Sequence, residues 1–377
     1  MCSLKVNLVS KILMMKKNNV PSESIKNFNS FLMFRIILSS IVIISHVSGA
    51  VKGSVEFSIG LFSIGTVAVF GFFSISGYLV TPGLLKYGQR RYLTNRFFRI
   101  YPGYIFCIIV TSLLFLPLWL SQANRNIFSW SLALNYFLGN LVLFPQSASS
   151  PNSTWNELSG LPVNGAHPGM VNGSIWTLPL EITCYAVLAV YVLISKKFGK
   201  EENKKVVATL FVIFWIISIF LALQIPDIGE HHGSKLVQLA TKWPYFLAFA
   251  SGVVIRLIIK VSKTRFMLIS LLIVAILTMQ NLKIWAVCGS LIFSFLCIQF
   301  GESAFFRSFH RLRDISFGLY LYHFPIIQFL VGYKLFFQNF VLLLISTFII
   351  SILFAYMSSR FIEVPAQLFI GKRLKNN

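Results

Sequence analysis

Long apolar runs, separated by short polar and basic segments, constrain this chain more than any other feature. A helix needs about 20 predominantly apolar residues to cross a hydrocarbon core of about 30 Å, and many of the runs approach that length. The mean hydropathy of +0.75 and the hydrophobic fraction of 56% are too high for a soluble core. The sequence therefore predicts an all-α, polytopic integral membrane protein with about ten transmembrane helices.

The predicted spans account for most of the chain. They are expected at residues 31–49, 62–82, 100–120, 174–195, 206–224, 236–255, 266–281, 285–300, 315–333 and 341–359. In this scheme residues 1–30 form a basic N-terminal segment, residues 31–365 form the transmembrane domain, and residues 366–377 form a basic tail.

The distribution of positive charge sets the orientation. Of the 33 Lys and Arg residues, 27 lie on one side when the spans alternate from a cytoplasmic N-terminus, and 6 lie on the other. Because Lys and Arg are enriched in cytoplasmic loops, we expect both termini in the cytoplasm. Topology therefore explains the net charge of +22, and no nucleic-acid partner is predicted.

One apolar stretch, residues 127–144, would reverse every later loop if it were an eleventh span. We therefore expect it to be re-entrant or interfacial on the outer side. It belongs to the longest connection, residues 121–173, which is rich in Ser, Asn, Pro and Gly. Because long structured loops tend to be functional, this outer loop is either a lid over an acceptor or a flexible connector.

The first span carries two ionisable side chains, Arg35 and His46. Eleven residues make about three helical turns, so both lie on one face, roughly 16 Å apart along the axis. Ionisable groups at membrane depth are costly and usually functional, and a neutral imidazole is a good general base. Taken singly, Arg35 also fits snorkelling to the interface, and His46 also fits a hydrogen bond between packed helices.

The beginning of the third span, Arg96-Phe-Phe-Arg99-Ile-Tyr-Pro102, places two guanidinium groups on one helix face. Such a pair near a helix N-terminus suits a phosphate group. Ordinary positive-inside charge explains the preceding Arg90 and Arg91 fully, and it explains the paired spacing less well.

Glu181 is the only acid predicted inside a span, and it ends the run Ser174-Ile-Trp176-Thr-Leu-Pro-Leu-Glu181. A span beginning near Ser174 places it about 10 Å below the outer surface, in the same half of the bilayer as His46. Because a buried carboxylate needs a partner, Glu181 is predicted to orient or charge-stabilise His46. A structural hydrogen bond between helices is the alternative, and Trp176 is expected to support the site.

Other residues are expected to support the site rather than react. Tyr322 and His323 fall near the middle of the ninth span, two to three residues before Pro325. That proline is predicted to loosen the helix and to free backbone carbonyls. Ser76 and Gly77 are small residues in the second span, where they permit close approach of another helix.

The cysteines predict neither a disulfide framework nor a metal site. Most lie in apolar spans, and none forms a paired spacing. The five are Cys2, Cys107, Cys184, Cys288 and Cys297. No metal cofactor is therefore expected.

Taken in order, these pieces resemble the membrane-bound acyltransferase-3 family, bacterial enzymes that O-acylate sugars. The resemblance runs from about Phe31 to Pro365. It rests on an Arg and a His eleven residues apart and on four short motifs. These are Phe-Phe-x-x-Ser-Gly, Arg-Phe-Phe-Arg-Ile-Tyr-Pro, Trp-Thr-Leu-x-x-Glu and Tyr-Leu-x-His-x-Pro.

The resemblance implies an O-acyltransferase of the bacterial inner membrane. It implies transfer of an acetyl or other short acyl group from cytoplasmic acyl-CoA to a hydroxyl of a cell-surface carbohydrate or lipid-linked glycan, such as O-antigen, capsule or exopolysaccharide. His46 would lie near the chemistry, and Arg35, Arg96 and Arg99 would bind the donor. The chain departs from the family at Asn29, in a region that is often acidic, which leaves open the partner of Arg35.

A carrier or flippase for lipid-linked sugars is the alternative, because it also needs many spans and intramembrane charges. It would leave the cytoplasmic arginine pair unexplained, and the sequence shows no internal repeat of the kind found in many transporters. Acetyl-CoA hydrolysis or labelling by the purified protein would separate the two classes.

Overall fold

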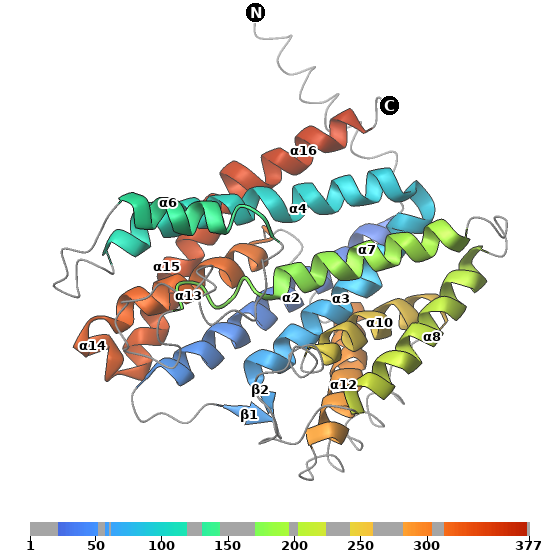
Figure 1. The fold of residues 1–377 in the computed structure, drawn as a ribbon, viewed down its shortest axis with the longest axis horizontal. Helices are drawn as coiled ribbons and strands as arrows, with labels where there is room; N and C mark the ends of the chain where they lie inside the picture. The colour runs from blue at the N-terminus through green and yellow to red at the C-terminus, as the bar shows by residue number, and fades with distance from the viewer. Residues whose placement is uncertain are drawn as a thin grey trace, which may run out of the picture.

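A computed structural model of the chain shows a helical protein (Figure 1). It describes residues 22–51, 57–59, 62–118, 130–143, 170–195, 203–223, 242–258, 282–303 and 313–374. The predicted helical class is confirmed for these ranges. A short antiparallel hairpin of β1 (Ser58–Ile59) and β2 (Phe62–Ser63) joins two of the helices.

The helices follow one another with few other elements between them. Their bounds are α2 (Ser22–Ala50), α3 (Ile64–Tyr87), α4 (Gln89–Val110), the π-helical turn η1 (Thr111–Phe115), α6 (Trp130–Gly139), α7 (Thr177–Ser195), α8 (Asn203–Leu223), α10 (Trp243–Leu257), α12 (Leu282–Glu302), α13 (Ser316–Val331), α14 (Lys334–Phe337), α15 (Phe340–Ser358), the π-helical turn η4 (Ser359–Glu363) and α16 (Val364–Arg373).

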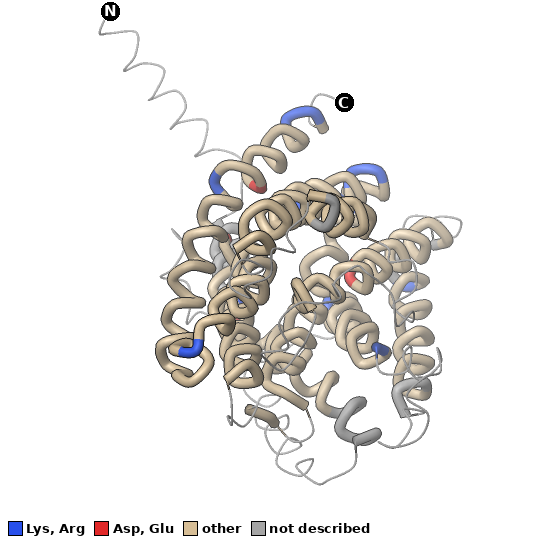
Figure 2. The backbone as a smooth tube through the Cα atoms, turned by 60° about the vertical axis from the view of Figure 1, so that its left-hand side comes forward, with Lys and Arg blue, Asp and Glu red and all other residues tan. Residues whose placement is uncertain are grey.

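Within the described ranges, five helical stretches are long and apolar enough to cross a membrane. They are Phe31–Ala50, Ile64–Tyr87, Gln89–Leu118, Thr177–Ile194 and Phe340–Arg373. Shorter apolar helices are Lys205–Phe220, Trp243–Leu257, Gly289–Glu302 and Ser316–Val331. Charged residues interrupt the helices rarely (Figure 2). The predicted span at 266–281 lies outside the described residues, so the count of ten is not confirmed.

Several helices begin or end away from the predicted positions. α4 begins at Gln89 rather than near residue 100, because its basic first turns are helical although they are not apolar. Gly88, with a φ of 79°, separates it from α3 in a conformation that favours glycine. The last apolar helix continues through η4 into α16, so the predicted tail from residue 366 is helical up to Arg373.

The centre of the fold is formed by α2, α3 and α13. α3 packs against α2, α10 and α12, whereas α13 packs against α2 and α15. Nearly every residue of α13 is buried. α15 instead exposes a row of large apolar side chains, as expected of a helix that faces lipid. They include Val341, Ile345, Ile349, Ile352 and Leu353.

α6 is the apolar stretch that was expected to be re-entrant or interfacial, and it lies beside α4 and η1 (Figure 1). Beyond its C-terminal end, the carbonyls of Asn140 and Leu141 accept hydrogen bonds from Tyr104 and Tyr101, each at 2.8 Å. Those tyrosines lie 12 and 15 residues into α4, which is roughly 18–22 Å along the helix. These hydrogen bonds satisfy two carbonyls beyond the C-terminal end of α6 and hold that end against α4.

Small residues allow α3 and α10 to pack closely, as predicted for Gly77. A Cβ atom at Gly77 would overlap the carbonyl oxygen of Phe249, and one at Gly252 would overlap the carbonyl oxygen of Ser74. Each glycine therefore faces the backbone of the other helix. This contact holds α3 against α10.

Gly77→Ala should destabilise the protein by about 1–3 kcal/mol, the usual cost of overpacking, because backbone cannot yield as a flexible side chain can. Gly83→Ala is the matched control, since it lies in the same helix and its Cβ would meet nothing within 4 Å. Thermal unfolding of both variants in detergent, followed by size-exclusion chromatography, measures the difference. Equal stability of the two variants would contradict the close packing.

Candidate active site

Two parallel helices carry the candidate site. Three contacts tie α2 to α13 in the same order along both helices: Arg35 Nη1 with Asp314 Oδ2 at 3.2 Å, Ser39 Oγ with the Ser316 carbonyl at 2.8 Å, and His46 Nδ1 with His323 Nε2 at 2.7 Å. The histidine pair is nine to eleven residues from the ion pair, or roughly 13–16 Å along the axes. The charged end and the imidazole end are therefore held at a fixed separation.

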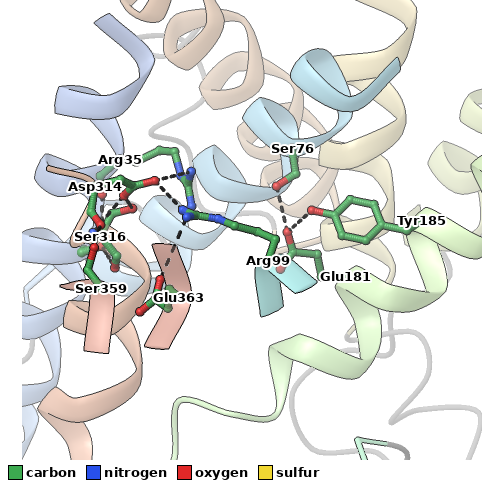
Figure 3. Close-up of polar contacts among 10 residues, drawn as sticks. Arg35, Ser76, Arg99, Glu181, Tyr185, Asp314, Ser316, Ser359 and Glu363 are labelled. Atoms are coloured by element: carbon green, nitrogen blue, oxygen red, sulfur yellow. Dashed lines mark hydrogen bonds and ion pairs between the residues drawn. The ribbon is translucent and has the colours of Figure 1, made fainter. Parts of the chain in front are cut away.

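The charged end is a cluster of two cations and two acids (Figure 3). Arg35 and Arg99 both reach the Asp314 carboxylate, and Arg99 Nη1 also lies 4.0 Å from Glu363 Oε2. The Asp314 carboxylate is fixed by the backbone N–H of Ser316 at 3.1 Å and by its hydroxyl at 2.7 Å. Asp314 is thus the partner of Arg35 that the sequence left open.

The π-helical turn η4 brings the second acid into this cluster. Ser359 donates to the Asp314 carbonyl at 2.9 Å, and Ser358 donates to Glu363 Oε1 at 2.8 Å. Gly103 of α4 leaves room for the Glu363 side chain, because a Cβ there would press against it. Such turns occur often at functional positions, and here the turn aims a nearly fully buried carboxyl group at Arg99.

Asp314 lies just before the start of α13, and its environment favours the charged form. Burial alone would raise the pKa of this carboxyl. The charges of Arg99 and Arg35, together with the hydrogen bonds from Ser316, outweigh burial and hold the pKa of Asp314 well below its usual range. Asp314 and the two arginines therefore form a lasting ion cluster at neutral pH.

The hydrogen bonds of His323 determine which nitrogen of His46 is protonated. His323 Nδ1 lies 3.0 Å from the Leu319 carbonyl, which can only accept, so this nitrogen carries a proton. In a neutral ring Nε2 is then the acceptor, and His46 Nδ1 donates to it across 2.7 Å. The lone pair of His46 therefore resides on Nε2, the nitrogen that can take up a proton.

Pro325 shapes the surroundings of this pair, as predicted. It has no N–H to donate to the carbonyl of Leu321, four residues earlier. Asn172 Nδ2 donates to that carbonyl at 3.0 Å, and Cys107 Sγ lies 3.5 Å from it. A carbonyl freed by proline thereby holds the residues that precede α7 against α13.

The segment 170–176 covers the histidine pair. Gln328 donates to the Met170 carbonyl at 2.6 Å, and Asn172 accepts from the Ser174 N–H at 3.0 Å. Ser174 Oγ lies 3.4 Å from His323 Nε2. These contacts place irregular backbone close to the histidines, inside the protein, where non-helical chain at membrane depth is tolerated.

Glu181 lies apart from the histidines. Both hydrogen bonds that it accepts from described residues end on Oε1: one from Ser76 at 2.9 Å and one from Tyr185 (Figure 3). One turn earlier on α7, Thr177 Oγ1 lies 2.7 Å from the Tyr320 hydroxyl. α7 therefore begins near the level of Tyr320, and Glu181 lies one turn farther along the helix, in the same cavity wall as Arg35 and Ser316.

A small cavity extends from the charged end as far as Tyr320. Its volume is about 50 Å³, and its walls come from α2, α3, α7 and α13. Arg35 and Ser316 line one end, Thr177 and Tyr320 line another part, and Glu181 contributes a carboxyl group between them. Tyr320 is three residues before His323, and their ring centroids are 6.1 Å apart.

Arg96 and Arg99 do not converge on one partner. Arg99 faces Asp314, whereas Arg96 lies over the Tyr185 ring at 5.9 Å and lines a separate, almost wholly apolar groove between α4 and α7. Arg96 has no carboxylate partner among the described residues. Two arginines on one face of α4 therefore contact different parts of the protein.

The structure brings together most of the predicted site residues, but in different pairs. His46 meets His323 rather than Glu181, and Glu181 meets Ser76. Trp176 stacks edge-on against Tyr245, and Tyr322 is buried against Phe354 on the side of α15.

Two residues that contact the site, Asp314 and Asn172, have no role in the sequence-based prediction. Asp314 is an acid at the start of a span in a strongly basic chain, which marks an ion-pair partner. Asn172 carried no such signal, because only the fold places it at the free carbonyl.

The fold is that of a membrane protein in which an imidazole pair and a cluster of arginines and carboxyl groups tie α2 to α13 at two levels. A sequence profile described as an acyltransferase domain matches residues 29–360, and the chain belongs to this acyltransferase-3 family. An O-acetyl transferase of Shigella phage Sf6 is 28% identical over 327 residues, which cover 81% of this chain and 86% of the phage protein. No solved structure gives a significant match. The protein is an acyltransferase.

Asp314→Asn should destabilise the protein by about 1–3 kcal/mol, because Arg35 and Arg99 lose the carboxylate they share. The loss is smaller than for a fully buried pair, since the Asp314 side chain is 25% exposed. The folded-state pKa of Asp314 is lowered, so its contribution is complete above the unfolded value of about 3.9 and is lost as the pH falls below it.

Denaturant unfolding in detergent micelles measures this contribution. The gap between wild type and Asp314→Asn should stay constant from about pH 8 to pH 5 and shrink only below about pH 4. A gap that closes already near pH 6 would contradict the ion cluster.

Proposed function

We propose that the protein transfers an acetyl group from cytoplasmic acetyl-CoA to a hydroxyl of a carbohydrate. The observation that carries this proposal is the cavity that begins at Arg35 and ends one turn from His323. It offers an anionic, thread-like donor a cationic entrance and an imidazole at the far end. The phage relative is described as an O-acetyl transferase, which supports acetyl as the acyl group.

The length of the donor fits this path. About twelve bonds separate the last phosphate oxygen of CoA from its sulfur. Extended polypeptide covers about 3.3–3.6 Å for every three backbone bonds, so an extended pantetheine arm reaches roughly 14 Å. The two pairs that tie α2 to α13 are roughly 13–16 Å apart. When the phosphates of acetyl-CoA contact the arginines, its thioester therefore lies near His46.

Arg35 and Arg99 are the proposed phosphate contacts. Asp314 and Glu363 hold the two guanidinium groups in place, and each guanidinium has five N–H donors, more than these carboxylates use. A guanidinium group that is already held in place loses less conformational entropy on binding phosphate than a flexible one. Arg96 lines the other groove, so we assign it no phosphate contact.

His46 is the proposed general base. Its Nε2 takes the proton of the acceptor hydroxyl as the oxygen attacks the thioester carbon. The tetrahedral intermediate collapses, the C–S bond breaks, and the CoA thiolate leaves with the electron pair. His323 accepts from His46 Nδ1 and so keeps the lone pair on Nε2, as the third member of a catalytic triad does.

The acceptor approaches from the outer side, where the segment 170–176 covers the histidine pair. A cell-surface or lipid-linked glycan is the proposed acceptor class, and the bacterial inner membrane with both termini in the cytoplasm is the proposed location. The 27-to-6 division of Lys and Arg supports that orientation.

His46→Ala should leave acetyl-CoA binding intact, because the phosphate contacts lie roughly 16 Å away. Transfer should fall by about 10²–10⁴-fold, the usual contribution of a positioned base. His323→Phe should have a smaller effect, because it disturbs the tautomer of His46 and not the base itself. Radiolabelled acetyl transfer to a glycan acceptor in proteoliposomes measures both. A folded His46→Ala variant that transfers at a near wild-type rate would refute the assignment.

Arg99→Ala should weaken acetyl-CoA binding by about 1.5–3 kcal/mol, the range of a charge-assisted contact. Arg99→Lys should recover part of that loss, because lysine restores the positive charge facing Asp314 but lacks the paired N–H donors of a guanidinium group. Arg96→Ala is the matched control, one turn away on the same helix, and should change the affinity little. Isothermal titration with each variant tests this, and equal losses for Arg96 and Arg99 would contradict the assignment.

A further inference from the structure

Glu181 is a carboxyl group in the cavity wall that the proposed reaction does not use. Its Oε1 accepts from both Ser76 and Tyr185, whereas Oε2 receives no hydrogen bond from a described residue. A carboxylate offers about four lone-pair sites, so further acceptor capacity remains. Glu181 is only partly buried and lines the cavity, so this capacity is open to a donor group of a ligand that occupies the cavity.

The surroundings limit which ligand group could donate to Glu181. The neighbouring cavity wall is formed mainly by apolar side chains: Val69, Phe72, Phe73, Leu178 and Phe317. A carboxylate cannot donate, so its partner must be an N–H or O–H group. A ligand that alternates methylene groups with amide N–H groups matches this lining. The pantetheine arm of CoA has that structure, with two amides between its phosphate and its sulfur.

The position of Glu181 agrees with this match. It lies one helical turn, roughly 6 Å, from Thr177. Thr177 in turn contacts Tyr320, three residues before His323. Arg35 lines the same cavity at its other end. An arm that extends from Arg35 to the histidines therefore has to pass Glu181.

We propose that Glu181 accepts a hydrogen bond from an amide N–H of the pantetheine arm and so fixes how far the thioester enters. Ser76 and Tyr185 orient its carboxylate for this contact. This inference rests on the proposed function, because it takes acyl-CoA as the donor. It gives Glu181 a role in recognising the donor arm rather than in orienting His46.

The two halves of CoA provide the test. Adenosine 3′-phosphate 5′-diphosphate carries the phosphates without the arm, and pantetheine carries the arm without the phosphates. Their inhibition constants against acetyl-CoA are measured for wild type, Glu181→Met and Glu181→Gln in proteoliposomes. Glu181→Met should raise the constant for pantetheine about 10- to 100-fold, the range of one charge-assisted hydrogen bond. It should change the constant for the nucleotide less than about two-fold.

Glu181→Gln keeps a carbonyl acceptor and should recover part of the pantetheine affinity. It also remains informative if the methionine variant does not fold. Arg99→Lys is the reciprocal control, because it should raise the inhibition constant of the nucleotide and leave that of pantetheine unchanged. In the turnover assay, loss of the arm contact should raise the KM for acetyl-CoA more than it lowers kcat.

Two results would overturn the inference: an unchanged pantetheine constant in both folded variants, or equal increases for both halves of CoA. A fall in kcat with unchanged binding would return Glu181 to the role of orienting His46. Failure of the proposed function looks different. In that case wild-type protein would neither bind acetyl-CoA nor be inhibited by either half of it.

Discussion

The arrangement around His46 depends on a backbone carbonyl that has lost its helical partner. Pro325 cannot donate to Leu321, and a carbonyl left unpaired at this depth would cost several kcal/mol. Asn172 satisfies it at 3.0 Å, and this bond brings the segment before α7 against the imidazoles. The same segment sets the depth at which α7 begins, and so the level of Glu181 in the cavity wall. One missing N–H thereby links α13, the covering segment and the wall of the cavity.

The second constraint is the parallel register of α2 and α13. A cluster of two arginines and two carboxylates fixes one end, and a pair of imidazoles fixes the other. Because the Asp314 carboxylate contacts both arginines, they are held in place in the absence of a ligand and still have N–H groups to offer. The helices act as a rigid spacer between the proposed phosphate contacts and the proposed base. That spacing matches the reach of a pantetheine arm.

Hydropathy and charge were enough to predict the helical class and the close approach at Gly77. Within the described ranges, five predicted spans correspond to helices long and apolar enough to cross a membrane, and four others correspond to shorter apolar helices. The effect of Pro325 was also predictable, since it is a property of one residue. The side-chain pairs between helices could not be predicted, because a helical wheel shows which residues share a face but not which helix packs against that face. Arg96 and Arg99 differ by about 60° around the axis, which is enough for one to meet Tyr185 and the other Asp314. A span beginning near Ser174 at the outer surface predicts Glu181 at the depth of His46, whereas α7 begins at Thr177, beside Tyr320, after the irregular segment 170–176.

The central claim is that the acyl end of the donor reaches the histidine pair through the cavity from the cytoplasmic side. An acyl-CoA with a diazirine on a short acyl group tests it most directly, in vesicles of known orientation, with the labelled peptides read by mass spectrometry. The account predicts labelling of α2 around His46 or of α13 around His323, only when the donor is on the cytoplasmic face, and its loss with excess CoA. Labelling confined to the lipid-facing residues of α15, or labelling that excess CoA does not reduce, would contradict it.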